Sequence, residues 1–279
     1  MNIYFKQLLS GHGSSVQLFL FLAIFIITWN IENIAGVLFD YKKWRHAWVN
    51  APFGLINLPG QLLLGLAFAK TISWTMHYHF GFLYYLHLKN PILIFLVAFI
   101  FLDFGEYVYH IIMHKVKRLW MFHIVHHSDS MVDVSTTLRE HPGENIIRLS
   151  FTLIWMFLSG ALFWMLILRQ IIQSITTIFA HMNYRLPSKI DNIIGLLFIT
   201  PNLHQVHHHY KQPYTDCNYG DVLSIWDRLF GTFKKFSGEQ LIFGVDTYME
   251  KEFTGNFIAL VKLPFRKYRR SGIEINTDD

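Results

Sequence analysis

The sequence predicts an all-α integral membrane protein, in which four or five transmembrane helices carry a cytosolic helical cap with a histidine-ligated site for two metal ions. Hydrophobic residues make up 52% of the 279 positions and charged residues only 15%, against about 25% charged residues in soluble domains. Several apolar stretches approach the roughly 20 residues needed to cross a bilayer. Sixteen histidines are present, and many of them fall in short clusters.

Five apolar stretches are expected to span or enter the membrane: 16–39, 52–69, 91–113, 145–168 and, less purely, 169–184. The first carries Asn30, Glu32 and Asn33 and the second carries Pro59, so we expect these parts to pack against protein. No linker divides the chain, which favours one structural domain. Within it we expect N-terminal transmembrane helices and loops in 1–90, the catalytic region in 91–240 and a basic cytosolic tail in 241–279.

The distribution of Lys and Arg predicts the orientation of these helices, because both residues accumulate in cytoplasmic loops. Basic residues follow the first and third stretches, whereas the second loop and the hairpin after the fourth stretch hold few. The predicted cytoplasmic residues are Lys42, Lys43, Arg45, Lys115, Lys117, Arg118 and Arg139, and the predicted opposite ones are Lys70, Lys89 and Arg169. All histidine clusters then face the cytoplasm.

The net charge of +5 is concentrated on that same side and includes five basic residues near the C-terminus, Lys262, Arg266, Lys267, Arg269 and Arg270. Basic residues beside a bilayer favour contact with anionic lipid headgroups over nucleic-acid binding. Cys217 is the only cysteine. An intramolecular disulfide and a cysteine-based zinc or iron–sulfur site within the chain are therefore excluded.

The spacing His-x-x-His-His occurs twice, at His123, His126 and His127 and again at His204, His207 and His208. With this histidine content the spacing should arise by chance about 0.05 times. On a helix the three rings share one face, but adjacent rings diverge by about 100°, so neighbours can serve two different ions. So many clustered imidazoles exceed what one ion can hold, and imidazole suits Fe, Zn, Cu or Ni.

Further histidines lie near these two clusters. His110 and His114 end the third apolar stretch, and their four-residue spacing lets both point into a common site. His181 closes the fifth stretch at the same level and is an expected ligand. His209 is expected to be exposed rather than a ligand, and the remaining histidines are left out because they lack partners at ligand spacing: His12, His46, His77, His79 and His87.

Acidic residues on the third stretch are candidates to support the metal ligands. Asp103 and Glu106 extend the face of His110 toward the membrane interior. An acidic side chain within a span costs roughly 2.5 to 3.5 kcal/mol on insertion scales, so both need partners, and metal-bound imidazole N–H groups are the expected ones. The alternative is that both lie at headgroup level and are hydrated. After the first triplet, Pro142 is expected to begin a helix, and His141 either caps it or ligates.

An ordered set of motifs resembles the fatty acid hydroxylase/sterol desaturase superfamily of membrane di-iron oxygenases. The resemblance covers roughly residues 103–233. Its motifs are His110-x-x-x-His114, His123-x-x-His126-His127, Arg139-x-His141-Pro142-x-Glu144, His181-x-Asn183, His204-x-x-His207-His208, Asp216-x-Asn218-Tyr219-Gly220 and the run 226–232.

The resemblance implies a helical membrane bundle whose cytosolic cap holds two irons and uses O₂ and two electrons to hydroxylate, or sometimes desaturate, a lipid such as a fatty acyl, sterol-like or ether lipid. It implies nine ligands: His110, His114, His123, His126, His127, His181, His204, His207 and His208. It further suggests supporting roles for Arg139, His141, Asn183, Asp216 and Asn218. Some members carry one more histidine four residues from the position of His181, where this chain has Thr177 and Arg185. The tenth position is then left to water, substrate or His141.

The expected partners are a lipid from the bilayer, O₂ and an electron donor of cytochrome b5, ferredoxin or reductase type. The donor is expected to be a separate protein, because the sequence contains no cytochrome b5, flavin or nicotinamide motif. Zn²⁺ can replace iron on overexpression. Two rival functions remain. A membrane zinc hydrolase is disfavoured because Ile111 stands where His-Glu-x-x-His places its glutamate, and a non-enzymatic haem- or metal-binding membrane protein would need axial histidines on facing spans.

Overall fold

The computed structural model describes residues 3–34, 41–236 and 241–270. All named elements in these ranges are helical, and the only strand-like pairings there are two isolated β-bridges. The predicted all-α fold is therefore confirmed. The longer helices are α1 (Ile3–Ile34), α2 (Lys43–Ile56), α3 (Leu58–Tyr78), α5 (Pro91–Lys115), α6 (Lys117–His127), α7 (Pro142–Ser159) and α8 (Phe163–Ala180). The shorter ones are α4 (Phe82–Tyr85), η1 (Val134–Leu138), α9 (Ser188–Ile194), α10 (Pro201–His207), α11 (Ile225–Leu229), α12 (Lys251–Thr254), α13 (Phe257–Lys262) and η2 (Leu263–Phe265).

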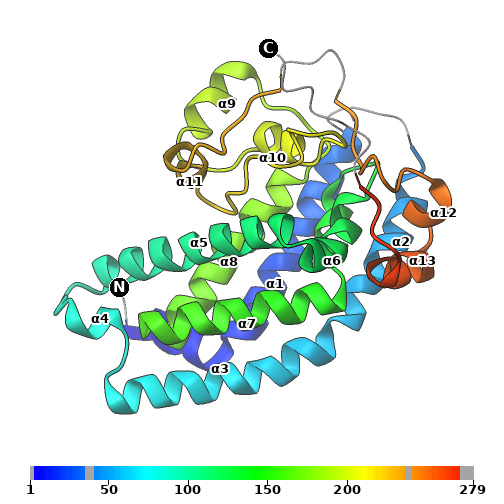
Figure 1. The fold of residues 1–279 in the computed structure, drawn as a ribbon. Coiled ribbons are helices and arrows are strands. Elements are labelled where there is room, and N and C mark those ends of the chain that lie inside the picture. Colours follow the sequence, from blue (N-terminus) through cyan, green and yellow to red (C-terminus); the bar gives the residue numbers. More distant parts are fainter. Residues whose placement is uncertain (1–2, 35–40, 237–240, 271–279) are drawn as a thin grey trace.

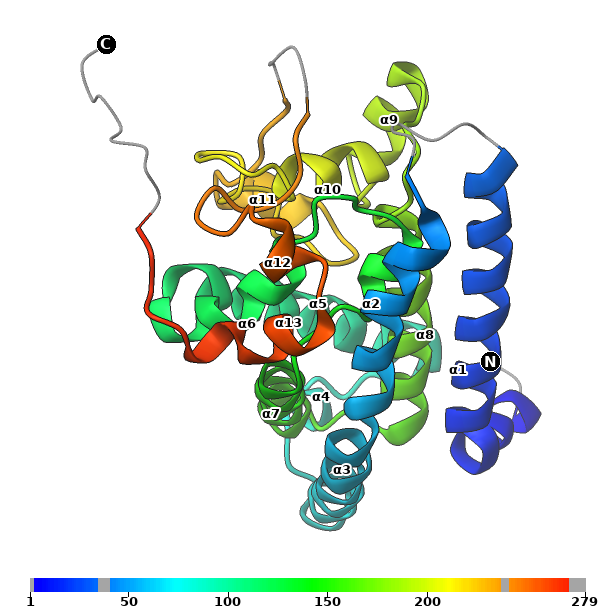
Figure 2. The same ribbon diagram turned by 90° about the vertical axis from the view of Figure 1, so that its right-hand side faces the viewer.

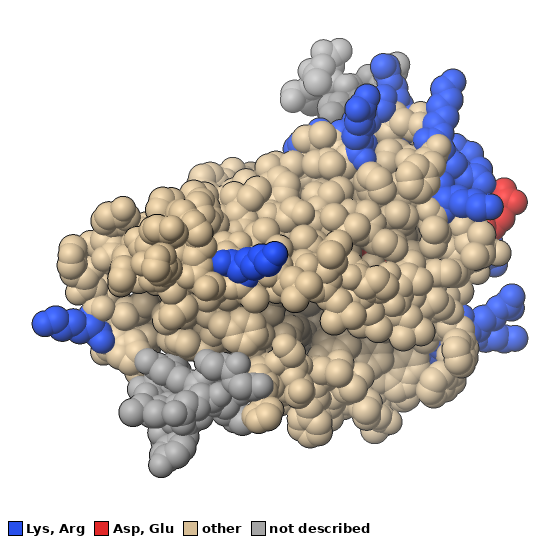
Figure 3. All heavy atoms as spheres, turned by 90° about the horizontal axis from the view of Figure 1, so that it is seen from below, with Lys and Arg blue, Asp and Glu red and all other residues tan. Residues whose placement is uncertain are grey.

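Long apolar helices form one part of the molecule, and shorter helices cover one end of it (Figures 1 and 2). Helix α3 packs on α7, α7 packs on α5, and α1 packs on α8. Four segments are long and apolar enough to cross a membrane: His12–Ile34, Lys43–Tyr85, Pro91–Lys115 and Phe163–Ala180. Figure 3 shows a face of the molecule that is almost free of charge, with Lys and Arg gathered toward one end. The chain is a multi-pass membrane protein.

The core of the helical bundle is apolar and draws on α3, α5, α7 and α8. Phe68 and Leu102 lie in it together with Met156 and a nearly continuous buried run from Trp164 to Ile167. Val16 and Leu20 of α1 pack against its edge. Burial of such side chains against one another fixes how the helices cross, since each one fills space that its neighbours leave.

The boundary predicted between the spans 145–168 and 169–184 is wrong. The chain turns at Gly160, between α7 and α8, so the first range runs across the end of a helix and the second is the latter half of α8. The tight turn needs glycine twice. Gly160 has a φ of 71°, and a Cβ on Gly81 would lie 2.3 Å from the nitrogen of Gly160.

Two of the three basic residues predicted to lie on the side opposite the histidines, Arg169 and Lys70, lie in helices rather than loops. Arg169 is in α8 and is buried, and Lys70 is an exposed residue of α3. The order of helix directions is unchanged, because the hairpin that joins α7 to α8 still lies at the end away from the histidines.

The N-terminal spans begin and end differently from the predicted ranges. Helix α1 has non-helical backbone angles at His12, and the last part of the predicted range, 35–39, lies outside the described residues. Helix α2 ends at Asn57, and Pro59 stands in the first turn of α3, where its missing N–H is not needed. As predicted, Glu32 packs against protein: it accepts hydrogen bonds from the backbone N–H groups of Val134 and Asn183.

The region predicted to be a basic tail contains α12, α13 and η2. Its apolar residues pack against α6 and α2, where Leu260 and Leu263 contact a cluster that includes Phe53, Ile124 and Val125. Residues 271–279 lie outside the described part of the chain. The C-terminal segment therefore braces the helix that carries the first histidine triplet.

Candidate metal centre

Nine histidines come together where four helices meet at one end of the bundle. Helix α5 carries His110 and His114 in its last turns, and α6 ends with the first triplet. Helix α10 carries the second triplet at its C-terminus, where His208 is the C-cap residue, and His181 is the C-cap residue of α8. All except His110 and His126 are buried.

These histidines form two groups that can each hold a metal ion. The five-histidine group consists of His110, His114, His123, His127 and His207, and the four-histidine group of His126, His181, His204 and His208. Within each group the candidate ligand atoms all lie within 4.8 Å of one another. These are the only such groups in the described residues, and their members are the nine histidines singled out from the sequence.

Each triplet divides between the two groups in the same way. The first and third histidines of a triplet enter one group, and the middle one enters the other. The two middle rings, His126 and His207, are nearly perpendicular to their neighbours, at 86° and 90°. His127 and His208 stack across the boundary, with ring centroids 4.5 Å apart. Each triplet therefore contributes two histidines to one group and one histidine to the other, which makes the arrangement of the triplets approximately two-fold.

The distances between nitrogens fit a shared ion. Two nitrogens bound to one ion at about 2.1 Å and at a right angle lie about 3.0 Å apart. The Nε2 atoms of His110 and His123 are 3.1 Å apart. In the other group the Nε2 atom of His181 lies 3.1 Å from that of His126 and 3.0 Å from that of His204.

Unsatisfied nitrogens in the five-histidine group also fit metal ligation. The Nε2 atoms of His114 and His207 and both ring nitrogens of His127 are buried and have no hydrogen-bond partner. Buried polar atoms of a folded protein almost always have a partner. A bound metal ion would satisfy these atoms.

The opposite ring nitrogens are held by oxygen atoms. Backbone carbonyl oxygens accept from Nδ1 of His110 (Tyr219), His181 (Thr177) and His207 (Cys217), at 2.6 to 2.8 Å. Such contacts fix which nitrogen carries the proton and orient the other toward an ion. These rings are therefore set as ligands through Nε2.

Six of these histidines are kept uncharged, as metal ligation requires: His126, His127, His181, His204, His207 and His208. Burial, and then the nearby imidazoles, hold the pKa of His126, His127, His204 and His208 well below the usual value. Burial lowers the pKa of His207 to about 3 and that of His181 to about 4. A neutral imidazole offers its lone pair to a metal without first losing a proton.

Carboxylates accept hydrogen bonds from one histidine of α6 and one histidine of α5. The Nδ1–H of His123 donates to Glu144 Oε1 at 2.5 Å, and that of His114 donates to Asp216 Oδ1 at 3.3 Å. Asp216 was among the predicted supporting residues. Glu144 was not, although it stands in the quoted motif after His141, two positions past the proline that begins α7. Its place in the first turn of that helix was the signal that could have identified it.

Asp103 and Glu106 have other partners than the imidazoles expected from the sequence. Asp103 accepts hydrogen bonds from the indole of Trp226 and from the backbone N–H groups of Val222 and Leu223. Glu106 accepts the hydroxyl of Thr152 and lies 3.5 Å from Arg169. Both carboxylates are buried. The loop after the second triplet and helix α8 therefore supply the partners that the sequence could not identify.

Arg139 and His141 brace the C-terminal segment. The buried Arg139 guanidinium donates to the carbonyl oxygens of Val125 and Thr254. His141 accepts from the N–H of Gly143 as the cap of α7, and its Nε2 donates to the carbonyl of Val261. His141 belongs to neither histidine group. Of its two expected roles, the structure shows the cap.

The two predicted asparagines lie in the loops beside the centre. The side chain of Asn218 donates to the carbonyl oxygens of Leu203 and Lys234, which ties the loop after the second triplet to α10. The backbone N–H of Asn183 donates to Glu32. Both are buried.

Two other histidines have partners outside the centre, and one of them, His209, differs from expectation. His209 is buried rather than exposed, against the rings of Tyr214 and Phe236. His46 lies in α2 and belongs to neither histidine group; its ring nitrogens contact Asp129 at 2.8 Å and Asp133 at 3.1 Å.

Asp129, which lies two residues past the first triplet, is held as a carboxylate. Burial alone would raise the pKa of Asp129, but His46 and Arg139 hold it well below its usual value. The hydroxyl of Thr136 donates to the same carboxylate at 2.8 Å. This network ties α2 and η1 to the end of the helix that carries the triplet.

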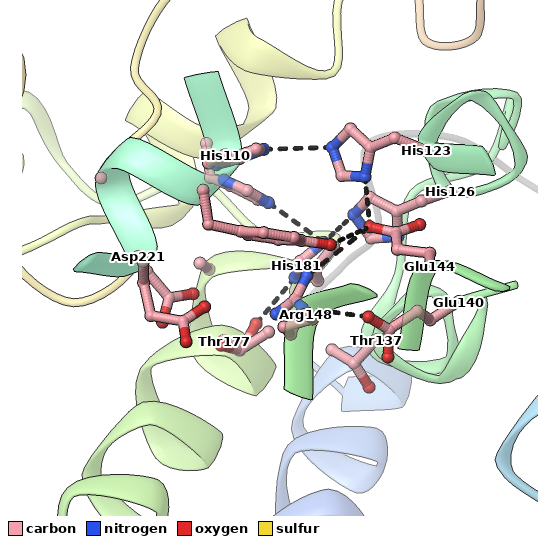
Figure 4. Close-up of a pocket in the computed structure, with 15 residues that line it drawn as sticks. His110, His123, His126, Thr137, Glu140, Glu144, Arg148, Thr177, His181 and Asp221 are labelled. Atoms are coloured by element: carbon pink, nitrogen blue, oxygen red, sulfur yellow. Dashed lines mark hydrogen bonds and ion pairs between the residues drawn. The ribbon is translucent and has the colours of Figure 1, made fainter. Parts of the chain in front are cut away.

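A cavity of about 70 Å³ reaches the centre from the side of α7 and α8 (Figure 4). It is several times the roughly 10–15 Å³ that one ordered water needs. Five histidines line it, from both groups: His110, His123, His126, His181 and His204. The other four are turned away, so the cavity gives access to one side of the centre.

The fold and this centre define a class: a helical membrane protein with two adjoining all-histidine sites, each suited to a transition metal. Residues 95–232 match the family model "Fatty acid hydroxylase". This part of the chain is thus similar to a fatty acid hydroxylase domain, and the resemblance predicted from the motifs is confirmed.

Curated relatives match about half of the chain. Human alkylglycerol monooxygenase is 33% identical over 156 residues, which cover 53% of this chain and 32% of the relative. Ornithine lipid hydroxylase OlsE of Rhizobium tropici is 31% identical over 131 residues, which cover 47% of this chain and 39% of the relative. The matches thus span only about a third of the length of these relatives. No solved structure matches the chain.

Proposed function

We propose that the protein is a membrane oxygenase that binds two iron ions and hydroxylates, or desaturates, a lipid. In the hydroxylation, R–H, O₂, two electrons and two protons give R–OH and H₂O. The observation that carries the proposal is the division of nine histidines into two adjoining groups that open on one cavity. The names of the relatives, a monooxygenase and a lipid hydroxylase, support a lipid substrate.

The residues of the chain would prepare this reaction in three ways. His123 and His114, hydrogen-bonded to Glu144 and Asp216, would hold their rings in the orientation that an ion needs. The carboxylates would also offset part of the positive charge, since nine neutral imidazoles offset none of it. Burial of the other histidines would keep bulk water from the reacting atoms. The bound irons would supply the activation of O₂.

The placement of the centre in the cell belongs to the same proposal. The basic residues near the centre favour a cytoplasmic location, with anionic headgroups alongside. The two electrons would come from a separate donor protein of cytochrome b5, ferredoxin or reductase type. The substrate would enter from the bilayer, because the lipid is already dissolved there.

Comparative lipidomics tests the proposal. Cells that express the protein should contain a lipid one oxygen heavier, or two hydrogens lighter, that cells without it lack. His208→Asn removes a ligand of the four-histidine group and should abolish the product. His77→Asn, at an exposed position of α3, is the control and should leave the product unchanged.

An unaltered lipid profile would count against the proposal if purified protein with Fe(II), a reductant and native lipids also consumes no O₂. Because zinc binds the same ligands, activity of iron-loaded protein decides this point, rather than the identity of the metal found on purification.

A further inference from the structure

Most residues that line the cavity beside the centre carry a polar or ionisable group. Its fifteen lining residues include no Leu, Ile, Val, Met, Phe or Trp. Sites that hold apolar ligands are lined mainly by hydrophobic and aromatic side chains. Apart from the five histidines, the lining consists of Glu106, Tyr109, Thr137, Glu140, Glu144, Arg148, Thr177, Ala180, Gly220 and Asp221.

Three carboxylate oxygens in this lining have no hydrogen-bond partner, and one of them, Glu140 Oε1, forms a close ion pair with Arg148 at 3.0 Å. The other two have no such close cation. Glu144 Oε2 is one, and its side chain is only 1% exposed. Asp221 Oδ2 is the other, and its nearest cation is Arg169 Nη2, 4.0 Å away. In Figure 4 Asp221 lies on one side of the view, Glu144 on the other, and Arg148 between them. Buried acceptors of this kind require a donor from outside the chain.

Support of the metal ligands does not account for Asp221. Glu144 contacts His123 and Asp216 contacts His114, so these two carboxylates have a structural reason to lie near the centre. Asp221 has an ion-pair partner only in Arg169 within the described residues, and that contact is long. Burial, and then the charge of Glu106, raise its pKa to about 7. The cost of placing this carboxyl here points to a ligand.

We propose that the cavity binds a hydrogen-bond-donating hydroxyl or amine of a lipid's polar region, with Asp221 as the acceptor. The C–H bond presented to the metals is then close to the headgroup rather than in the middle of a hydrocarbon chain. This inference rests on the proposed function and names the substrate class of the same site.

The dimensions of the cavity agree with this arrangement. At about 70 Å³ it holds a small polar group and not a long chain. Three charged residues of the lining are partly exposed: the side chains of Arg148, Glu140 and Asp221 are 30%, 20% and 17% exposed. The hydrocarbon part of the lipid therefore stays in the bilayer.

A binding measurement tests the proposal without turnover. Full-length protein in nanodiscs is loaded with Zn²⁺, which occupies histidine sites but does not activate O₂. Two radiolabelled probes are compared: 1-monopalmitoylglycerol, with two free hydroxyls, and its di-O-methyl derivative, which keeps the chain and the acceptor oxygens but has no donor. At pH 8.5, where Asp221 with its pKa of about 7 is charged, the wild type should bind the first roughly tenfold more tightly, as expected for a hydrogen bond to a charged acceptor.

Asp221→Asn keeps the size of the side chain and should reduce this preference to about two- to threefold, since a neutral acceptor is weaker. Asp221→Leu should abolish it. The control Glu250→Gln changes an exposed carboxylate that pairs with Arg269 and should keep the preference of the wild type. Equal binding of both probes by the wild type, or a preference that survives both Asp221 variants, would overturn the proposal.

Product analysis with the iron-loaded protein separates this inference from the proposed function. A hydroxyl group in the middle of the chain would refute the headgroup placement and leave the oxygenase intact. A clear probe preference without any oxidised lipid would refute the oxygenase and leave the binding site intact.

Discussion

Replacement of Glu144 by glutamine tests how the centre holds one of its ligands. Glu144 accepts the Nδ1–H of His123 at 2.5 Å, and both side chains are buried. Glutamine keeps the size and an acceptor oxygen but lacks the charge. A hydrogen bond to a charged group contributes about 1.5–3 kcal/mol and a neutral one about 0.5–1.5 kcal/mol. The loss of about 1–2 kcal/mol corresponds to a roughly five- to thirtyfold weaker affinity for an ion in the five-histidine group.

The assay is metal retention against a competing chelator, followed by elemental analysis of purified protein. The Glu144→Gln variant should lose one of its two ions at a lower chelator concentration than the wild type and keep the other. Glu140→Gln is the matched control, because Glu140 lies in the same cavity and pairs with Arg148 at 3.0 Å but contacts no histidine in the described residues. Equal retention by both variants and the wild type, or equal loss from both variants, would refute the reasoning.

Two further predictions concern stability. In Gly105→Ala the new methyl group would meet the ring of Trp155 at 2.6–2.8 Å, so we expect the free energy of unfolding to fall by about 1–3 kcal/mol and the melting temperature to be lower. The control Gly65→Ala, whose new methyl group has nothing within 4 Å, should leave the melting temperature nearly unchanged. Equal melting temperatures of the two variants would contradict this account of the contact between α5 and α7. Asp129→Asn should cost about 1.5–3 kcal/mol near pH 7. Because the pKa of Asp129 is lower in the folded than in the unfolded protein, this stabilisation is present above about pH 4 and is lost as the pH falls further. The melting temperatures of the wild type and the variant should therefore differ clearly at pH 6 and converge below about pH 4. A separation that persists unchanged below pH 4 would show that the charge of Asp129 is not the cause.

The histidine centre could be predicted from the sequence because its geometry is local. The spacing of three and four residues on a helix decides which rings share a face, and it decides that His126 and His127 diverge. That neighbours enter different groups follows from the same spacing, and the structure shows this division. Only the exchange of one ligand between triplets depends on how α6 and α10 pack.

The supporting contacts could not be predicted in the same way. Asp103 and Glu106 lie on the face expected for them, yet their partners, Trp226 and Thr152, come from elements that sequence spacing does not place beside α5. The same reason applies to Glu144: its place in the first turn of α7 is a signal, but sequence spacing does not show that this turn lies against His123.

Helix boundaries in the apolar region were the weakest part of the prediction. The run across 145–168 is almost uniformly hydrophobic, so hydropathy gives no sign of the turn at Gly160. The turn depends on the close approach of Gly81, which is distant in the sequence. The prediction for Arg169 failed for a related reason. A charged residue within an apolar run is typical of a loop between two helices, but Arg169 lies inside the bundle beside Glu106.

The number of metal ions per chain tests the account most directly. Protein purified from iron-replete cells and analysed for all transition metals should contain close to two ions per chain. His181→Asn, which removes a ligand of the four-histidine group only, should contain close to one. A wild-type value of one or none, with the protein folded and the histidines intact, would contradict the central claim that the two groups each hold an ion.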